Sequence, residues 1–179
     1  AMFNMETFLA KPPPTGALGP NGRKLTRDEL VAVTETYFDG IVAANKAPIL
    51  AHPGCRRFEN GLEVTGRPVA ADNPDDGYQG RGDCMSGQGR FNVVFVSGRR
   101  YPVVDVEKQA VLAVATFIRE PGNHKRRNHL HEYFYMDDGK IRDVYTAFFY
   151  PEANLPVPNW PPYDPNFPLA PDMGKATTK

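Results

Sequence analysis

Alternating apolar and polar residues near the end of the chain predict a β-hairpin. Asp138-Gly139 suits a two-residue turn, because such turns need positive φ at their central positions. With that tip, Asp137 pairs with Lys140, and each step back along one strand pairs with a step forward along the other. Side chains alternate across a strand, so one predicted face collects His129, His131, Tyr133, Tyr135, Arg142, Val144, Thr146 and Phe148. The opposite face is apolar except for Glu132 and Asp143. We interpret the row of imidazoles and phenols as the lining of a buried pocket.

The pattern before the hairpin predicts one long helix followed by strands. Thr26 is a good N-cap and Glu29 completes a capping box. An apolar stripe follows at helical spacing, formed by Leu30, Val33, Tyr37, Ile41 and Ala44. We expect the helix to end at Asn45, a short helical turn at 48–51, and strands over 56–64, 91–96, 101–106 and 110–118. This order predicts an α+β fold in which a curved antiparallel sheet wraps around N-terminal helices.

Composition shifts divide the chain into three segments. Residues 1–24 contain three consecutive prolines and are expected to form an extended arm without its own core. Residues 25–150 form one domain, in which 65–90 lacks a clear period and is typical of a functional flap or a partner contact. Residues 151–179 are rich in proline, which excludes a central strand, so we expect this tail to pack on the domain or on a neighbouring subunit.

Composition and charge narrow the classes of function. The 179 residues are 41% hydrophobic, which fits one domain with a core, and 21 basic residues balance 21 acidic ones. Nothing therefore favours nucleic acid or a membrane as partner. No secretory leader is recognisable, so we expect a cytoplasmic location, although a removed leader stays open. Cys55 and Cys84 are interpreted as small core residues, since two cysteines support neither a disulfide framework nor a zinc site.

Three features, in this order, resemble the nuclear transport factor two-like superfamily, which includes SnoaL-type cyclases and steroid isomerases. They are a helix ending in Asn45, a polar residue closing the next strand, and the Asp-Gly-Lys-Ile hairpin that begins at Asp138. The resemblance covers roughly 25–150 and implies a cone-shaped fold that binds small apolar ligands. The run Arg99-Arg100-Tyr101-Pro102-Val103-Val104-Asp105 is similar to a subgroup with bacterial lyases of lignin-derived aromatics and fungal meroterpenoid isomerases.

The likeness to the steroid isomerases implies site residues. Tyr37 precedes Asn45 by the interval that their oxyanion tyrosine keeps from the helix end. Asn60 stands at the position of their general base, and Glu59 beside it is the substitute, because an amide cannot take a proton. His131 stands where they have a second oxyanion donor. We therefore expect the catalytic residues to be His131, Tyr37, Glu59 and Asn60. The expected substrate-binding residues are His129, Tyr133, Tyr101, Arg100, Phe58, Thr146 and Phe148.

The resemblance implies a cofactor-independent acid–base lyase or dehydratase acting on a small aromatic substrate. For the subgroup, the reaction is loss of formaldehyde and water from a lignin-derived diarylpropane diol. A histidine with a pKa near neutrality suits such chemistry, and a tyrosine donor stabilises oxyanion charge. Two alternatives stay open: an isomerase of a polycyclic or terpenoid ketone, and a non-catalytic ligand-binding or assembly domain.

The two histidines of the predicted hairpin also have other interpretations. His131 could be a core histidine with satisfied hydrogen bonds, which is the commoner case in proteins. His129 and His131 could share a metal ion, but three or four converging ligands are needed, so we expect no metal and no cofactor.

Relatives are commonly homo-oligomers, and we expect a dimer or trimer through exposed aromatic residues, namely Tyr145, Phe149, Tyr150 and Trp160.

Overall fold

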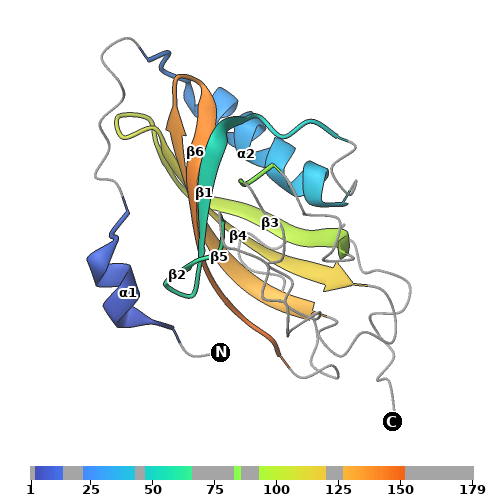
Figure 1. Ribbon diagram of the computed structural model, residues 1–179. Coiled ribbons are helices and arrows are strands. Elements are labelled where there is room, and N and C mark those ends of the chain that lie inside the picture. The colour runs from blue at the N-terminus through green and yellow to red at the C-terminus, as the bar shows by residue number, and fades with distance from the viewer. Residues whose placement is uncertain are drawn as a thin grey trace.

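The computed structural model describes residues 3–13, 22–42, 47–65, 83–85, 93–119 and 127–151, and they form an α+β fold (Figure 1). The helices are α1 (Met5–Ala10) and α2 (Arg27–Val42). The strands are β1 (Ala51–Glu59), β2 (Leu62–Glu63), β3 (Val93–Asp105), β4 (Ala110–Arg119), β5 (Arg127–Asp137) and β6 (Lys140–Phe149). The predicted fold class is confirmed. In these ranges, no helix has the length and apolar character needed to span a bilayer.

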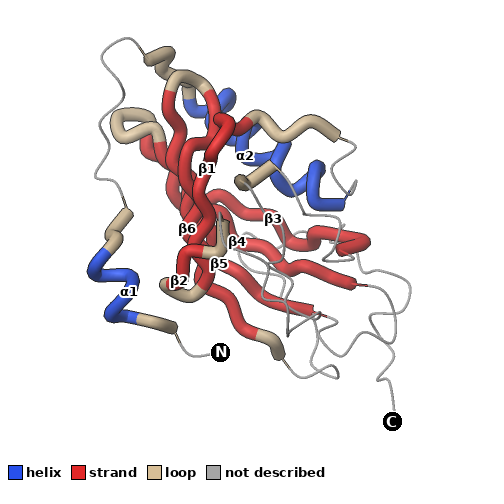
Figure 2. The backbone as a smooth tube through the Cα atoms, viewed as in Figure 1, coloured by secondary structure: helices blue, strands red, loops and turns tan. Residues whose placement is uncertain are grey.

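All six strands belong to one curved sheet in the order β2-β1-β6-β5-β4-β3 (Figure 2). Neighbouring strands are antiparallel except β1 and β6, which run parallel, so the sheet is mixed where an antiparallel one was expected. Rings of α2 contact one face of the sheet, and Phe8 of α1 contacts Tyr145 on the other. We call the α2 side the inner face and the α1 side the outer face.

The long helix begins as the sequence predicts. The amide of Glu29 donates to Thr26 Oγ1 at 3.4 Å, and the amide of Thr26 donates to Glu29 Oε2 at 2.9 Å, which is a capping box. Leu30, Val33, Tyr37 and Ile41 of the predicted stripe are buried, whereas Ala44 lies outside the described residues. Phe38 on the same helix meets Phe117 and Phe134 edge-on. The predicted helix end, Asn45, lies outside the described residues.

Three local predictions are wrong. Residues 48–51 form no helical turn, because Ile49 and Ala51 are buried where β1 begins. A single strand, β3, replaces the two expected over 91–106, since a register shift at positive-φ Gly98 bends it without ending it. The N-terminal arm is not extended throughout, because the Asn4 side chain caps the short helix α1. The predicted tail, Trp160 and most of 65–90 lie outside the described residues.

The hairpin register follows the prediction only near its tip. Asp138 and Gly139 have positive φ, and Asp137 pairs with Lys140. A β-bulge then inserts Arg142, so the predicted Tyr135–Arg142 pair is wrong and Tyr135 opposes Asp143. One extra residue reverses which side every later residue faces. The inner face of β6 therefore carries Val144, Thr146 and Phe148, opposite to the histidines of β5.

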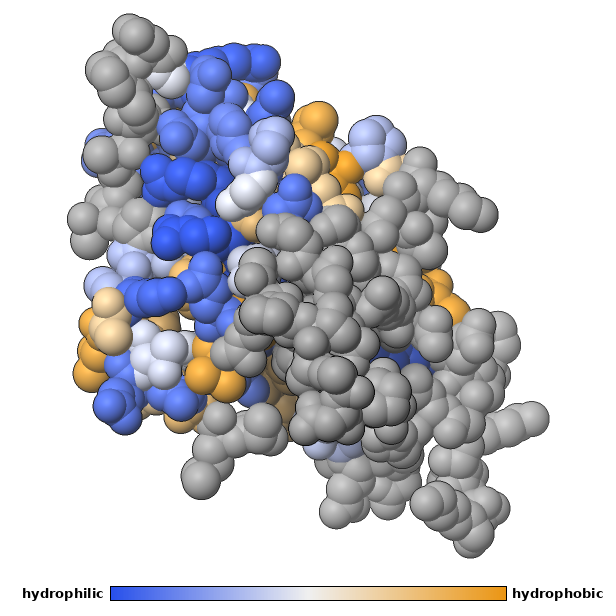
Figure 3. Space-filling model, in the orientation of Figure 1, coloured by the Kyte–Doolittle hydropathy of each residue, from blue (hydrophilic) through white to orange (hydrophobic). Residues whose placement is uncertain are grey.

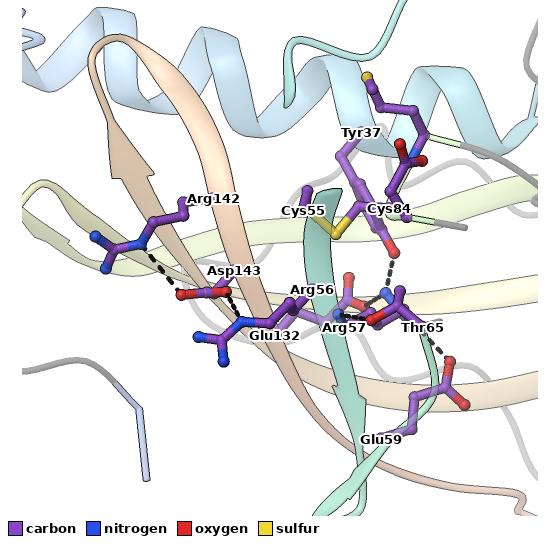
Figure 4. Close-up of a disulfide and its surroundings, with 12 residues drawn as sticks. Tyr37, Cys55, Arg56, Arg57, Glu59, Thr65, Cys84, Glu132, Arg142 and Asp143 are labelled. Carbon is purple, nitrogen blue, oxygen red and sulfur yellow. Dashed lines mark hydrogen bonds and ion pairs between the residues drawn. A yellow bond between two sulfur atoms is a disulfide. The ribbon is translucent and has the colours of Figure 1, made fainter. Parts of the chain in front are cut away.

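A disulfide joins Cys55 of β1 to Cys84 in the described turn 83–85 (Figure 4). Their Cα atoms lie 5.2 Å apart, and the Cys84 amide donates to the Cys55 carbonyl at 3.1 Å. The interpretation of the two cysteines as unpaired core residues is wrong. Disulfides are rare in the reducing cytoplasm, so this bond does not fit the predicted cytoplasmic location.

Candidate functional site

The sheet divides the predicted site residues between its two faces. Tyr37, Glu59 and Thr146 meet on the inner face, beneath α2, in one hydrogen-bonded cluster. His131, Tyr133 and Phe58 lie on the outer face, where they line a cavity beneath α1. The two groups cannot act on one bond, because the sheet lies between them. The inner group holds the ionisable cluster, and we take it as the candidate site.

Arg57 is the centre of the inner cluster and is almost completely buried. Its Nε donates to Glu59 Oε1 at 2.7 Å and its Nη1 to Glu132 Oε1 at 2.8 Å. Nη1 also donates to the hydroxyl of Tyr37, which reaches down from α2 (Figure 4). Burial alone would lower the pKa of Arg57, but the charges of Glu132 and Glu59 outweigh it and raise that pKa. The guanidinium is therefore a fixed positive charge inside the domain.

Glu132 is fully buried in the middle of β5. Its Oε1 accepts from Arg57 and, at 2.8 Å, from the Thr146 hydroxyl, while Oε2 has no hydrogen-bond partner among the described residues. Burial raises the pKa of Glu132, opposed by attraction to Arg57. We expect the upward direction to prevail, because Glu59 competes for the same guanidinium.

The raised pKa of Glu132 predicts how stability changes with pH. The folded state holds this proton more tightly than the unfolded chain, whose carboxyl titrates near the ordinary value of 4.5. The stabilising contribution is therefore complete below that value and is lost as pH rises through the folded pKa. Glu132→Gln cannot ionise, so we expect its free energy of unfolding to fall less than that of the wild type over this rise. Denaturant unfolding at several pH values measures the difference; parallel curves would contradict it, and exposed Glu107→Gln is the control.

A cleft opens beside the cluster at the ends of β4, β5 and β6. It is lined by Arg57, Glu59, Phe117, Arg119, Asn128, Phe148 and Tyr150. Arg119 Nη1 donates to Asn128 Oδ1 at 2.6 Å, and its guanidinium lies 5.8 Å from the centre of the Tyr150 ring. The enclosed volume is about 20 Å³, room for about one water molecule. A larger ligand therefore enters only if side chains at the rim, such as half-exposed Tyr150, move aside.

The remaining predicted residues have other surroundings. Asn60 forms the turn after β1 with φ 47°, and its side chain exchanges hydrogen bonds with the backbone of Phe148, at 3.1 and 2.9 Å. Its contacts are those of a turn residue. The Tyr101 hydroxyl donates to Glu35 of α2, and burial raises the pKa of Tyr101. Arg100 Nη1 donates to the carbonyl of Arg99 at 2.9 Å. Both residues of β3 lie outside the lining of the cleft.

His129 and His131, the two histidines of β5, lie together on the outer face. His131 is exposed at the edge of the outer cavity. His129 is buried, its Nδ1 lies 2.8 Å from Thr116 Oγ1, and burial lowers its pKa. Tyr145, expected to be an exposed interface residue, is buried under the N-terminal segment, whereas Phe149 is 58% exposed. The described residues include no group of three or more His, Cys, Asp or Glu side chains placed to hold a metal ion.

Sequence reasoning missed the residues at the centre of the site. Arg57 reads as one of several surface arginines, and Arg119 and Asn128 follow no motif. Glu132 carried the one usable sign, because a lone carboxylate interrupts an apolar strand face there. Such a carboxylate needs a buried cation. Its partner is 75 residues away in the sequence, so local patterns could not name it.

Comparisons with known proteins agree with this fold. Residues 23–148 match the family described as "Domain of unknown function (DUF8021)". No curated protein matches the chain. A protein of unknown function with a cystatin-like fold from Methylobium petroleophilum PM1 is 19% identical at a TM-score of 0.50, over 73% of this chain and 82% of that one. An NTF2-like protein from Burkholderia xenovorans LB400 is 12% identical at a TM-score of 0.41, over 69% and 92%.

The likeness to the Methylobium protein concerns the fold alone. The cystatin-like fold agrees with the cone-shaped fold that the sequence resemblance implies, and membership of the superfamily stays a prediction. The narrower resemblance, to lyases of lignin-derived aromatics and to meroterpenoid isomerases, stays a prediction.

Proposed function

The chain belongs to the DUF8021 family, a domain of unknown function, and from its own residues we propose that it is a cofactor-independent acid–base enzyme. The substrate we propose is a small aromatic molecule that binds at the inner cleft. One observation carries the proposal. A buried guanidinium holds two carboxyl groups and a phenol at one end of a cleft whose other walls are three aromatic rings, Arg119 and Asn128.

Each lining residue suits one role in such a reaction. Glu59 lies at the cleft and is the proposed base. The sequence resemblance names Glu59 as the substitute for this role, because Asn60 at the expected base position cannot take a proton. Arg57 and Arg119 also line the cleft, so two cations stabilise an oxyanion that forms there. Glu132 and Tyr37 touch Arg57 and keep its guanidinium in place, which makes them positioning residues. Phe117 and Phe148 offer ring surfaces to an aromatic substrate.

The reaction we propose is an elimination, and loss of formaldehyde and water from a diarylpropane diol is the specific candidate. Glu59 takes the proton of the primary alcohol, and the bond to the hydroxymethyl carbon breaks to release formaldehyde. The freed electron pair forms the carbon–carbon double bond as the benzylic hydroxide departs. The proton held by Glu59 then converts this hydroxide to water, so the carboxylate is restored. Isomerisation of a polycyclic ketone needs the same base and the same cations, and is the alternative.

The test is turnover measured by mass spectrometry in deuterated water, with a chelator present. The panel contains diarylpropane diols, β-hydroxy aromatics and polycyclic enones. We expect formaldehyde release or dehydration, and a loss of at least about a hundredfold in Glu59→Gln. Glu107→Gln makes the same change at an exposed turn and should keep full activity. Deuterium uptake without cleavage would favour the isomerase. Binding without turnover would favour a ligand-binding domain, and activity only without chelator would contradict cofactor independence.

A further inference from the structure

A second cavity lies on the outer face of the sheet, beneath the N-terminal segment. Its volume is about 420 Å³, within the range of small-molecule sites. Phe3, Phe8 and Pro13 form its roof, and side chains of β1, β4, β5 and β6 form its floor. The proposed reaction makes no use of this space, because the sheet separates it from Glu59 and Arg57.

The segment that covers the cavity is held at both ends. On one side, the Asn4 amide donates to the Asn60 carbonyl at 2.7 Å. A Cβ at Gly61 would lie 2.1 Å from the Asn4 carbonyl oxygen, so glycine is needed for this approach. On the other side, Lys11 pairs with Glu63 at 2.5 Å, and the Tyr145 hydroxyl donates to the carbonyl of Pro12 at 3.4 Å. These contacts hold the two ends of the segment, and α1 between them lies over a space that its own side chains do not fill.

Aromatic rings make most of the floor. Phe58 and Tyr145 are stacked, with parallel planes and centres 4.4 Å apart, and Tyr133 and Tyr135 lie 5.0 Å apart. Phe8 meets Tyr145 edge-on from the roof. Such rings offer faces and edges that attract a further flat ring.

The polar side chains of the described lining are three tyrosines, Thr146 and, exposed at the edge of the cavity, His131. Burial raises the pKa of Tyr135 to about 12, so its phenol keeps the proton at physiological pH and can donate a hydrogen bond. No Asp, Glu, Lys or Arg is among the described residues of the lining. The nearby charges of Arg56 and Arg142 are both paired with Asp143. An ion inside the cavity would lose its water without gaining a carboxylate, ammonium or guanidinium partner.

We propose that this outer cavity binds a neutral, planar aromatic molecule that carries a hydroxyl or carbonyl group. The rings stack on or against the ligand, and the tyrosine hydroxyls bond its oxygen. The chain's own N-terminal segment covers the cavity, so a second copy of the protein could reach it only by displacing α1. That helix buries none of its residues, and Met5 and Leu9 are more than half exposed (Figure 3 shows apolar surface at this side of the molecule). A ligand can therefore enter when α1 lifts.

The test is isothermal titration calorimetry with 2-naphthol, a flat neutral phenol. Ala147→Trp places a large ring in the cavity and should weaken binding at least about tenfold. Leu112→Trp enters it from another strand and should do the same, which guards against misfolding of one variant. Val103→Trp is the matched control, because Val103 pairs with Leu112 in the sheet but lies outside the described lining, and its affinity should equal that of the wild type.

Three results would overturn the proposal. One is the absence of measurable binding. Another is unchanged affinity for 2-naphthol in both tryptophan variants, which would locate the ligand elsewhere. Loss of 2-naphthol binding in Glu59→Gln would then point to the inner cleft. The third is a light-scattering mass that falls in Ala147→Trp, which would make this face an interface between copies. The outer site and the proposed enzyme can fail separately, because Ala147 does not line the inner cleft and Ala147→Trp should leave turnover unchanged.

Discussion

Replacing Arg57 with methionine should lower the free energy of unfolding by about 3–5 kcal/mol. The variant keeps an unbranched apolar side chain but removes the guanidinium that pairs with Glu59 and Glu132. A buried carboxylate without a partner has lost its hydration and gains nothing in return. Turnover should fall to background as well, because the proposed oxyanion loses one of its two guanidiniums. Denaturant unfolding and the turnover assay measure the two effects.

The neighbouring residue provides the control. Arg56→Met removes a half-exposed arginine from the other side of β1, and Asp143 keeps Arg142 as a partner. The expected loss is about 1 kcal/mol or less. Adding Glu132→Gln to Arg57→Met should recover part of the stability, since it removes one of the uncompensated charges. Equal losses of unfolding free energy in Arg57→Met and Arg56→Met would contradict the prediction, because they would show that the buried carboxylates do not depend on the Arg57 charge.

Removing the disulfide should lower the free energy of unfolding by about 3–4 kcal/mol, because the bond closes a long loop in the unfolded chain. The two cysteines are separated by 29 residues, most of which lie outside the described part of the structure. The bond also joins β1 to the turn 83–85, and its β1 end, Cys55, lies two residues before Arg57. Cys55→Ala combined with Cys84→Ala should therefore destabilise the domain and weaken the hold on the inner cluster.

Reductant gives the same result without a mutation. The wild type should unfold at a lower denaturant concentration when a reductant is present, and the double alanine variant should show no such change. A wild-type midpoint that ignores the reductant would contradict the prediction. Mass spectrometry after thiol alkylation confirms which state each sample was in.

The parts of the fold that could be predicted are those set by neighbouring residues. The capping box of Thr26 and Glu29 lies within one helical turn, and Asp138-Gly139 determines its own turn conformation. The bulge at Arg142 could not be predicted, because both registers place a half-apolar row on each face of β6. The parallel pairing of β1 with β6 joins segments far apart in the sequence, and no local pattern encodes it.

Part of the inner cluster was expected from the sequence. Tyr37 and Glu59 were named through the resemblance to the steroid isomerases, by their intervals from a helix end and a strand end, and both lie in the inner cluster. Their catalytic role stays a prediction. The histidine and tyrosine face of β5 does line a cavity, on the outer side of the sheet, but the bulge in β6 separates Thr146 and Phe148 from it. Packing beneath α2 removes side chains from water entirely, which suits Leu130 and Phe134. Tyrosine and histidine keep one polar end, which suits the half-covered outer face.

Alternate residues of strand β1 belong to the two different sites on the two faces of the sheet. Arg57 and Glu59 face the charged cluster, whereas Arg56 and Phe58 face the outer side. A one-residue insertion or deletion within this strand would exchange the two linings, placing an aromatic ring among the carboxylates and a guanidinium against the tyrosines. Both compartments would be lost in a single event. The length of β1 is thus under a stricter constraint than the chemical identity of any one of its side chains.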